Sequence, residues 1–253
     1  MPFWEDGEIH EAISSVRGKL VDDLSQWSLK KATLGLIRSD LTKDLEKTQE
    51  GYPIVKAYNG KLPASIVEVG KIGKCKQPGA WLNGFSDDVI LDRIWKRPCD
   101  YLNKIPLGGG IIAPDFSVKL HMSPKEKEYN IFRRNAIAAI AQKYDFPTII
   151  PLTWAEYASF EYCCNGIEPE GIYAISNIGV MNDFISRKLF RVGLMEMVRL
   201  LNPLGFILYG YPMENTFGVP TTLYRNPHYA LRKRKTVSLY EDFSSNQYRL
   251  RKS

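Results

Sequence analysis

The sequence predicts an α/β fold with a mostly parallel sheet of about four strands joined by helical crossovers. Between residues 110 and 211, four apolar runs rich in β-type residues alternate with three segments of helical spacing. Parallel strands need a crossover of about a dozen residues, and a helix is the usual crossover. The expected strands are residues 110–116, 148–152, 171–176 and 206–209.

Capping residues mark where the crossover helices should begin. Residues 123–126 place a serine cap, a proline at the first helical position and a glutamate three residues after the cap. Thr153 and Glu156 repeat the spacing of a capping box, and Asn182 could cap the third helix. Pro203 should end that third helix, because the residue before a proline is forced out of the α region.

Residues 1–50 are expected to form a helical region before the core. An apolar stripe recurs there at steps of three or four, which favours a helix that either docks on the core or dimerises the chain. The stripe consists of Ile9, Ile13, Val16, Leu20, Leu24 and Trp27.

Residues 51–84 are expected to form an edge β-hairpin followed by a loop. Asn59 and Gly60 lie between two β-rich runs, and this dipeptide is a strong hairpin signal. Pro53 and Pro63 would restrict the hairpin to the edge of the sheet. The α/β core is then expected over residues 85–223, followed by a tail over residues 224–253.

The net charge is concentrated in the C-terminal tail. The chain carries 34 basic and 28 acidic residues, a net charge of +6. Residues 225–253 hold eight basic and two acidic residues, so the tail accounts for the whole excess and the rest balances to zero. Cations interleaved with aromatic residues suit a phosphate backbone with stacked bases, in DNA or RNA. A tail that only solubilises the chain is the alternative. The candidate nucleic-acid contacts are Arg232, Lys233, Arg234, Lys235, Arg249, Arg251 and Lys252.

Cysteine usage and hydropathy favour a cytoplasmic protein that does not bind a membrane. No apolar run reaches the roughly 18 residues of a spanning helix, and the acidic N-terminus lacks a signal-peptide core. The four cysteines show no CxxC spacing and the three histidines are scattered, so no metal site is predicted and the thiols are expected to be free.

Any chemistry is expected at the carboxyl ends of the parallel strands, where ligands of open α/β sheets bind. Asp115 and Glu156 are the candidate catalytic residues there, because two carboxylates can divide acid and base roles or hold Mg²⁺. Both could instead serve only a turn or a cap. Further candidates on this rim are Ser117, Trp154, Asn177, Tyr209 and Tyr211.

An ordered series of short blocks resembles a known family. The blocks include Asp87-Asp88 before Arg93-Ile94-Trp95, residues 110–117 (Gly-Ile-Ile-Ala-Pro-Asp-Phe-Ser), Arg133-Arg134-Asn135 and Tyr209-Gly210. Over about residues 85–211 the chain resembles domain-of-unknown-function family 4417, which occurs largely in phages, plasmids and other mobile elements. The resemblance implies a mobile-element context, in the cytoplasm of an infected or element-carrying cell, and no particular reaction.

Three functions follow from these observations. The first is a phage or mobile-element accessory protein that associates with nucleic acid through its basic tail. The second is an enzyme that processes a phosphoester or nucleotide at the strand-end rim. The third is a non-catalytic binder or inhibitor of a protein partner, which would use the N-terminal stripe.

Overall fold

A computed structural model describes residues 37–180, 184–213 and 215–225. The chain divides into two compact units, Met1–Asp44 and Leu45–Ser253. In the first unit, the short helix α3 (Ser39–Thr42) follows Arg38, whose guanidinium pairs with Asp40 at 2.8 Å. The N-terminal stripe predicted from the sequence lies outside the described residues.

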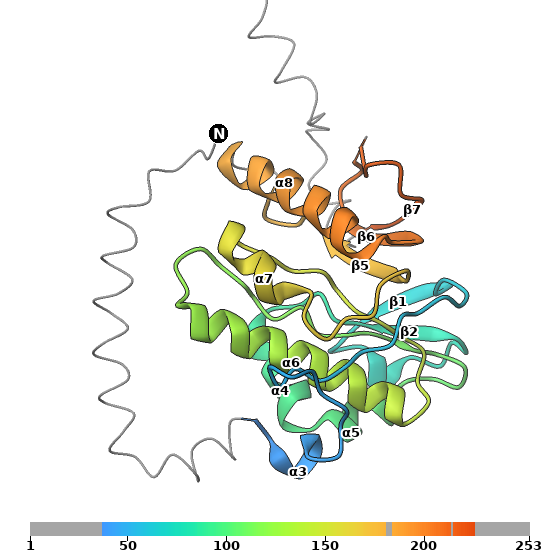
Figure 1. Cartoon of the computed structure of the whole chain (residues 1–253). Coiled ribbons are helices and arrows are strands. Elements are labelled where there is room, and N and C mark those ends of the chain that lie inside the picture. Colours follow the sequence, from blue (N-terminus) through green and yellow to red (C-terminus); the bar gives the residue numbers. More distant parts are fainter. Residues whose placement is uncertain (1–36, 181–183, 214, 226–253) are drawn as a thin grey trace, which may run out of the picture. The chain divides into compact units, whose positions relative to one another are not determined.

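The described part of the second unit contains seven strands, which pair in parallel and in chain order (Figure 1). Strands β1 (Ser65–Glu68), β2 (Ala80–Asn83), β3 (Ile111–Ile112) and β4 (Thr148–Ile149) form one sheet. Strands β5 (Ile172–Ser176), β6 (Gly205–Gly210) and β7 (Thr221–Arg225) form the other. A parallel bridge between Pro151 and Ala174 continues the order from β4 to β5. The four strands predicted from the sequence are therefore confirmed as parallel.

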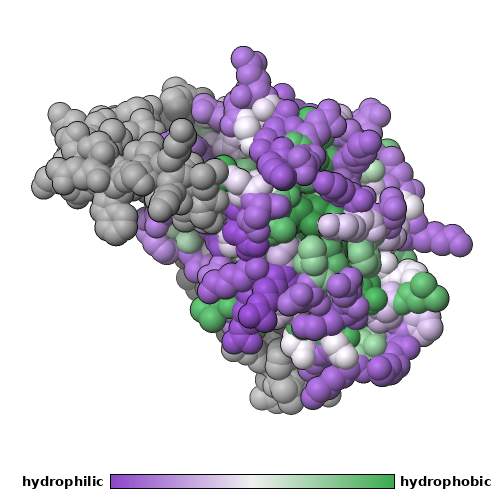
Figure 2. Space-filling model, turned by 90° about the horizontal axis from the view of Figure 1, so that it is seen from below, coloured by the Kyte–Doolittle hydropathy of each residue, from purple (hydrophilic) through white to green (hydrophobic). Residues whose placement is uncertain are grey.

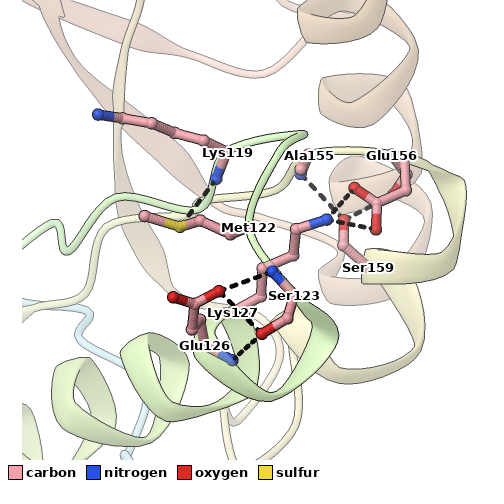
Figure 3. A network of polar contacts seen from close by, with 8 residues as sticks. All are labelled: Lys119, Met122, Ser123, Glu126, Lys127, Ala155, Glu156 and Ser159. Atoms are coloured by element: carbon pink, nitrogen blue, oxygen red, sulfur yellow. Dashed lines mark hydrogen bonds and ion pairs between the residues drawn. The ribbon is translucent and has the colours of Figure 1, made fainter. Parts of the chain in front are cut away.

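Helices lie in the connections between successive strands from β1 to β6, and α6, α7 and α8 lie along one side of the strands in Figure 1. The connections hold η1 (Ile72–Lys74), α4 (Asp88–Lys96), α5 (Pro98–Leu102), α6 (Pro124–Lys143), η2 (Tyr157–Ser159), α7 (Phe160–Cys163) and α8 (Phe184–Leu201). The start of α6 is the capping box that the sequence predicts. Glu126 donates its backbone N–H to the Ser123 hydroxyl at 3.3 Å, and its carboxylate accepts the Ser123 N–H at 2.8 Å (Figure 3).

The side chains of successive strand residues point to two different hydrophobic clusters. The outer cluster joins the strands to α6 and α8, with buried contributions from Ile131, Leu194 and Met197. The buried residues of the inner cluster come from five strands, β2 to β6, and the partly buried Ile66 of β1 and Tyr224 of β7 extend it to all seven. Its members include Ile66, Trp81, Ile112, Ile149, Ala174, Ile207 and Tyr224.

The sheet curls until its first and last strands approach each other. In a flat sheet of seven strands the outermost strands would lie about 29 Å apart, from six spacings of about 4.8 Å. Instead, the Tyr224 hydroxyl on β7 donates a hydrogen bond to the carbonyl of Pro63, just before β1. We call the result the barrel-like sheet. Its interior is the inner cluster, and its amino-terminal end is filled by Tyr58, whose ring lies 5.4 Å from that of Trp81.

The predicted edge hairpin around Asn59 and Gly60 is wrong. The first arm pairs elsewhere: Val55 forms a parallel bridge with Ile167, and the Tyr58 carbonyl accepts the N–H of Ile172 at 2.7 Å. The second arm contains β1, which pairs in parallel with β2. Strand β2 itself lies in a stretch that the sequence predicts to be a loop. Its four residues are all buried, so burial in the barrel-like sheet outweighs the local turn signal.

Candidate site at the carboxyl ends of the strands

The barrel-like sheet gathers the loops after its strands at one rim, because parallel strands end at the same edge. The structure brings three pairs of rim residues into contact, and the two members of each pair come from different segments near the ends of the strands. These pairs are Asp115 with Thr153, Phe85 with Tyr209, and Asn177 with Tyr211.

Asp115 is the rim residue with the most unusual electrostatic environment. Its N–H donates to the Gly84 carbonyl at 3.0 Å, and its carboxylate accepts the hydroxyl of Thr153. Burial raises the pKa of this carboxyl to about 6, although the Thr153 bond and the positive charge of Arg134 act in the opposite direction. A carboxyl group that titrates near neutral pH can take or give a proton under ordinary conditions.

Asp88 is a second carboxylate near Asp115 that the rim prediction missed. It stands in the first turn of α4, and it accepts the backbone N–H of Ser117 at 3.0 Å. The Ser117 carbonyl accepts the side-chain amide of Asn130 at 2.6 Å. Ser117 is thus held through its backbone from two helices. The like charge of Asp88 is one further reason why the pKa of Asp115 is raised.

Glu156, the other predicted catalytic residue, is engaged in an ion pair. Its carboxylate oxygens lie 2.6 and 2.7 Å from the ammonium of Lys127, whose side chain is only 3% exposed (Figure 3). The expected capping box between Thr153 and Glu156 does not form, because the Thr153 hydroxyl bonds Asp115 and the Glu156 side chain turns to α6. The two candidate carboxylates therefore have different partners.

Trp154 and Asn177 each make contacts that stabilise the fold at the rim. The Trp154 ring packs 5.2 Å from that of Phe190 on α8, and Gly193 gives it room: a Cβ there would lie 1.9 Å from the indole nitrogen. The buried Asn177 amide makes two 2.8 Å hydrogen bonds with the backbone of Tyr211, one through each side-chain atom. It fastens the loop after β5 to the end of β6.

Tyr209 and Phe85 form an aromatic pair across the rim. Their rings stack at 5.3 Å with an interplanar angle of 4°, although β2 and β6 are not neighbours in the strand order. Burial raises the pKa of the Tyr209 phenol, and a side-chain hydrogen bond with Asn83 acts against that rise. The pair places aromatic rings beside polar groups, with the Tyr209 ring buried and the Phe85 ring partly exposed at the rim.

The predicted nucleic-acid contacts, from Arg232 to Lys252, lie outside the described residues. The last described residue is Arg225, which is exposed and lies beside Gly210 in the parallel register. Both residues stand at the carboxyl ends of their strands. Arg225, the first basic residue of the C-terminal tail, therefore stands at the same rim as Asp115 and Tyr209.

Other surfaces offer less specific chemistry. On α8, the exposed fractions of Phe184, Ile185, Val192 and Met195 range from 40% to 57%. Figure 2 shows further hydrophobic side chains gathered within a mostly hydrophilic face. Among the residues that the structure describes, no group of three or more histidine, cysteine, aspartate or glutamate side chains could hold a metal ion. None of the described helices combines the length and apolar character needed to cross a membrane.

Comparison with known proteins supplies the family. A family described as a domain of unknown function (DUF4417) matches residues 50–223. The chain belongs to this family. The resemblance seen in the sequence is confirmed, and the DUF4417 region extends it to include the segment before β1 and most of β7.

Two phage proteins are similar to the chain. It is 29% identical over 132 residues to the Gene 1 protein of Mycobacterium phage L5, covering 52% of this chain and 58% of that protein. It is 28% identical over 132 residues to the Gene 1 protein of Mycobacterium phage D29, covering 52% and 49%. The chain spans about half the length of these curated relatives. No solved structure matches it.

Proposed function

We propose that this DUF4417 protein is a phage accessory protein that associates with nucleic acid through its basic segment, residues 225–253, in the cytoplasm of the host cell. The observation that carries the proposal is the charge distribution: this segment holds the whole net charge of +6. It also contains Tyr229, Tyr240, Phe243 and Tyr248, on which bases can stack. The similarity to two phage proteins supports the biological setting.

The position at which the basic segment begins supports a role for the rim in nucleic-acid binding. Because Arg225 stands at the carboxyl end of β7, a strand of nucleic acid held by the segment would pass close to the rim. The partly exposed ring of Phe85, stacked on the buried ring of Tyr209, offers aromatic surface there, and Asp88 and Asp115 offer carboxylates. Carboxylates repel phosphate, so in this proposal the basic segment supplies the attraction and the rim supplies contacts to a base or sugar.

The proposal is tested by a salt titration of binding. Each phosphate neutralised by a cation releases counterions, with a slope of about −0.9 per contact for duplex DNA. Neutralising Arg232, Lys233, Arg234 and Lys235 to glutamine should weaken binding to all sequences, and should flatten the slope by up to about 3.6 if all four contact phosphate. Fluorescence anisotropy with labelled single- and double-stranded DNA and RNA provides the measurement.

The matched control neutralises four exposed lysines of the second unit, which removes the same charge from another part of the protein. Binding should then change much less than in the tail variant. Absence of any binding at low ionic strength would end the proposal, and equal losses in both variants would reduce it to a general effect of net charge. The control residues are Lys47, Lys56, Lys104 and Lys143.

A second candidate function is an enzyme that acts on a phosphoester or nucleotide at the rim. The observation that favours it is Asp115, whose raised pKa of about 6 and contact with the Thr153 hydroxyl suit a general acid or base. Mg²⁺ is a candidate cofactor for this chemistry, because Asp88 adds a second carboxylate near Asp115. Hydrolysis assays on nucleotides and oligonucleotides, with and without Mg²⁺, would test it.

A further inference from the structure

Three sulfur atoms meet where the end of α7 packs on α8. The Sγ atoms of Cys163 and Cys164 lie 3.9 Å apart. The Sδ atom of Met197 on α8 lies 3.8 Å from Cys163 Sγ and 3.3 Å from Cys164 Sγ. All four cysteines of the chain are free, as the sequence predicts, so both thiols are available. The sequence does not reveal this triangle, because Met197 is 33 residues beyond Cys164.

The size of this triangle fits three ligands of one metal ion. Sulfur ligands at about 2.3 Å from a metal ion lie about 3.8 Å apart in a tetrahedral arrangement and about 4.0 Å apart in a trigonal one. Two of the three sulfur–sulfur distances, 3.9 and 3.8 Å, already match this spacing, and the third, 3.3 Å, is shorter by about half an ångström. Thiolate and thioether ligands select soft ions, of which Cu(I) is the common biological example.

A buried positive charge beside the thiols determines which ionic charge suits the site. The Arg134 side chain is 1% exposed and bonds only neutral groups: the side-chain oxygen of Asn135 and the carbonyl of Cys163. One of its terminal nitrogens has no hydrogen-bond partner among the described residues. Burial lowers the pKa of the Arg134 guanidinium, and the neighbouring groups that act against this shift are Cys163 and Cys164, followed by Asp115.

The charge balance favours a monovalent ion. Two thiolates and one monovalent cation carry a net charge of −1, which Arg134 neutralises. A divalent ion would make the metal complex neutral and leave only the carboxylate of Asp115 to compensate the buried guanidinium, which is costly because Arg134 has no carboxylate among its hydrogen-bond partners in the described residues. The nearby carboxylate of Glu196 is already paired with Arg199 at 2.6 Å. Cys163 and Met197 are buried, whereas Cys164 is partly exposed and gives an ion access from solvent.

We propose that Cys163, Cys164 and Met197 bind one soft monovalent metal ion, of the class that Cu(I) represents. Each thiol gives up its proton as its sulfur bonds the metal, so two protons are released per ion. The methionine contributes a neutral third ligand, and Arg134 compensates the charge of the complex. The proposal is independent of nucleic-acid binding.

The test is an anaerobic titration of the full, reduced chain with Cu(I) against a competing copper chelator. We expect one tight equivalent, and X-ray absorption should show three sulfur ligands at about 2.3 Å. Cys164→Ser should weaken binding at least tenfold. Met197→Leu, which keeps a side chain of similar volume, should weaken it less and reduce the sulfur count to two.

Cys75→Ser and Cys99→Ser serve as matched controls, because each removes a thiol that is partly exposed and lies outside the triangle. Both should keep full affinity, and thermal melts establish that every variant is folded. Tight binding that survives Cys164→Ser, or a two-sulfur complex in the wild type that Met197→Leu leaves unchanged, overturns the proposal. Absence of any tight equivalent overturns it as well.

Discussion

Replacing Asp115 with asparagine should stabilise the protein at neutral pH. The folded protein raises the pKa of this carboxyl from 3.8 to about 6, mainly because burial disfavours the charged form. The folded state therefore holds the proton more tightly than the unfolded chain between about pH 4 and pH 6. Stability falls as the pH rises through this window, and the cost of the buried charge is fully present at pH 7.

The size of the effect follows from the two pKa values. A pKa difference of one corresponds to 1.36 kcal/mol, so a rise from 3.8 to about 6 sets an upper limit of about 3 kcal/mol. Asp115 keeps some exposure, which reduces the expected gain to about 1–3 kcal/mol. Asparagine removes the charge but still offers an oxygen to the Thr153 hydroxyl. The melting temperature should rise by about 2–12 °C at pH 7 and change little at pH 4.

Urea unfolding of both proteins from pH 4 to pH 8 measures this effect, with the exposed Asp100→Asn as the control. The free energy of unfolding of the two proteins should diverge between pH 4 and pH 6 only for the Asp115 variant. A variant less stable than wild type at pH 7 would refute the reasoning, because Asp115 would then be a structural anion. If the variant is more stable and has also lost ligand binding or activity, Asp115 carries the strain typical of a functional site.

Two further predictions concern rim residues whose contacts are structural. Glu156→Gln should destabilise the fold by about 1–3 kcal/mol, since it leaves the buried Lys127 ammonium without its counter-ion. Adding Lys127→Met to this variant should recover part of the lost stability. If denaturant melts show no recovery in the double variant, the ion-pair explanation is contradicted. Asn177→Ala should cost about 2–3 kcal/mol, because two backbone hydrogen bonds to Tyr211 are lost; a calorimetric melt like that of wild type would show that water replaces them.

The parts of the fold that the sequence predicts are those set by local signals. Buried parallel strands read as continuous apolar runs, which identify β3 to β6. The serine, proline and glutamate at residues 123–126 identify the start of α6, because all three act within one helical turn. By contrast, β2 lies in a segment rich in glycine, lysine and proline, and only its position between β1 and β3 makes it a strand.

Contacts between distant segments explain what the sequence does not predict at the candidate site. The order of the strands predicts that Asp115 and Thr153 lie at one rim, and they are in contact. The ion pair of Glu156 depends on Lys127, which is 29 residues away and has no signal of its own. The stack of Phe85 on Tyr209 requires the sheet to curl, and no local pattern encodes curvature.

The curl also explains why the family unit begins at residue 50 and not at residue 85, where the recognisable blocks begin. The segment from Val55 to Tyr58 joins the backbone of residues 166–172, and the Tyr58 ring covers one end of the inner cluster. Strand β2 places Trp81 within that cluster, together with Ile112 and Ile207. Without these elements the inner faces of β3 and β6 would meet water. The rim depends on the same closure, because Phe85 lies two residues after the end of β2 and its partner Tyr209 is the penultimate residue of β6. The segment that carries no recognisable motif is thus needed both to complete the core and to position half of the aromatic pair.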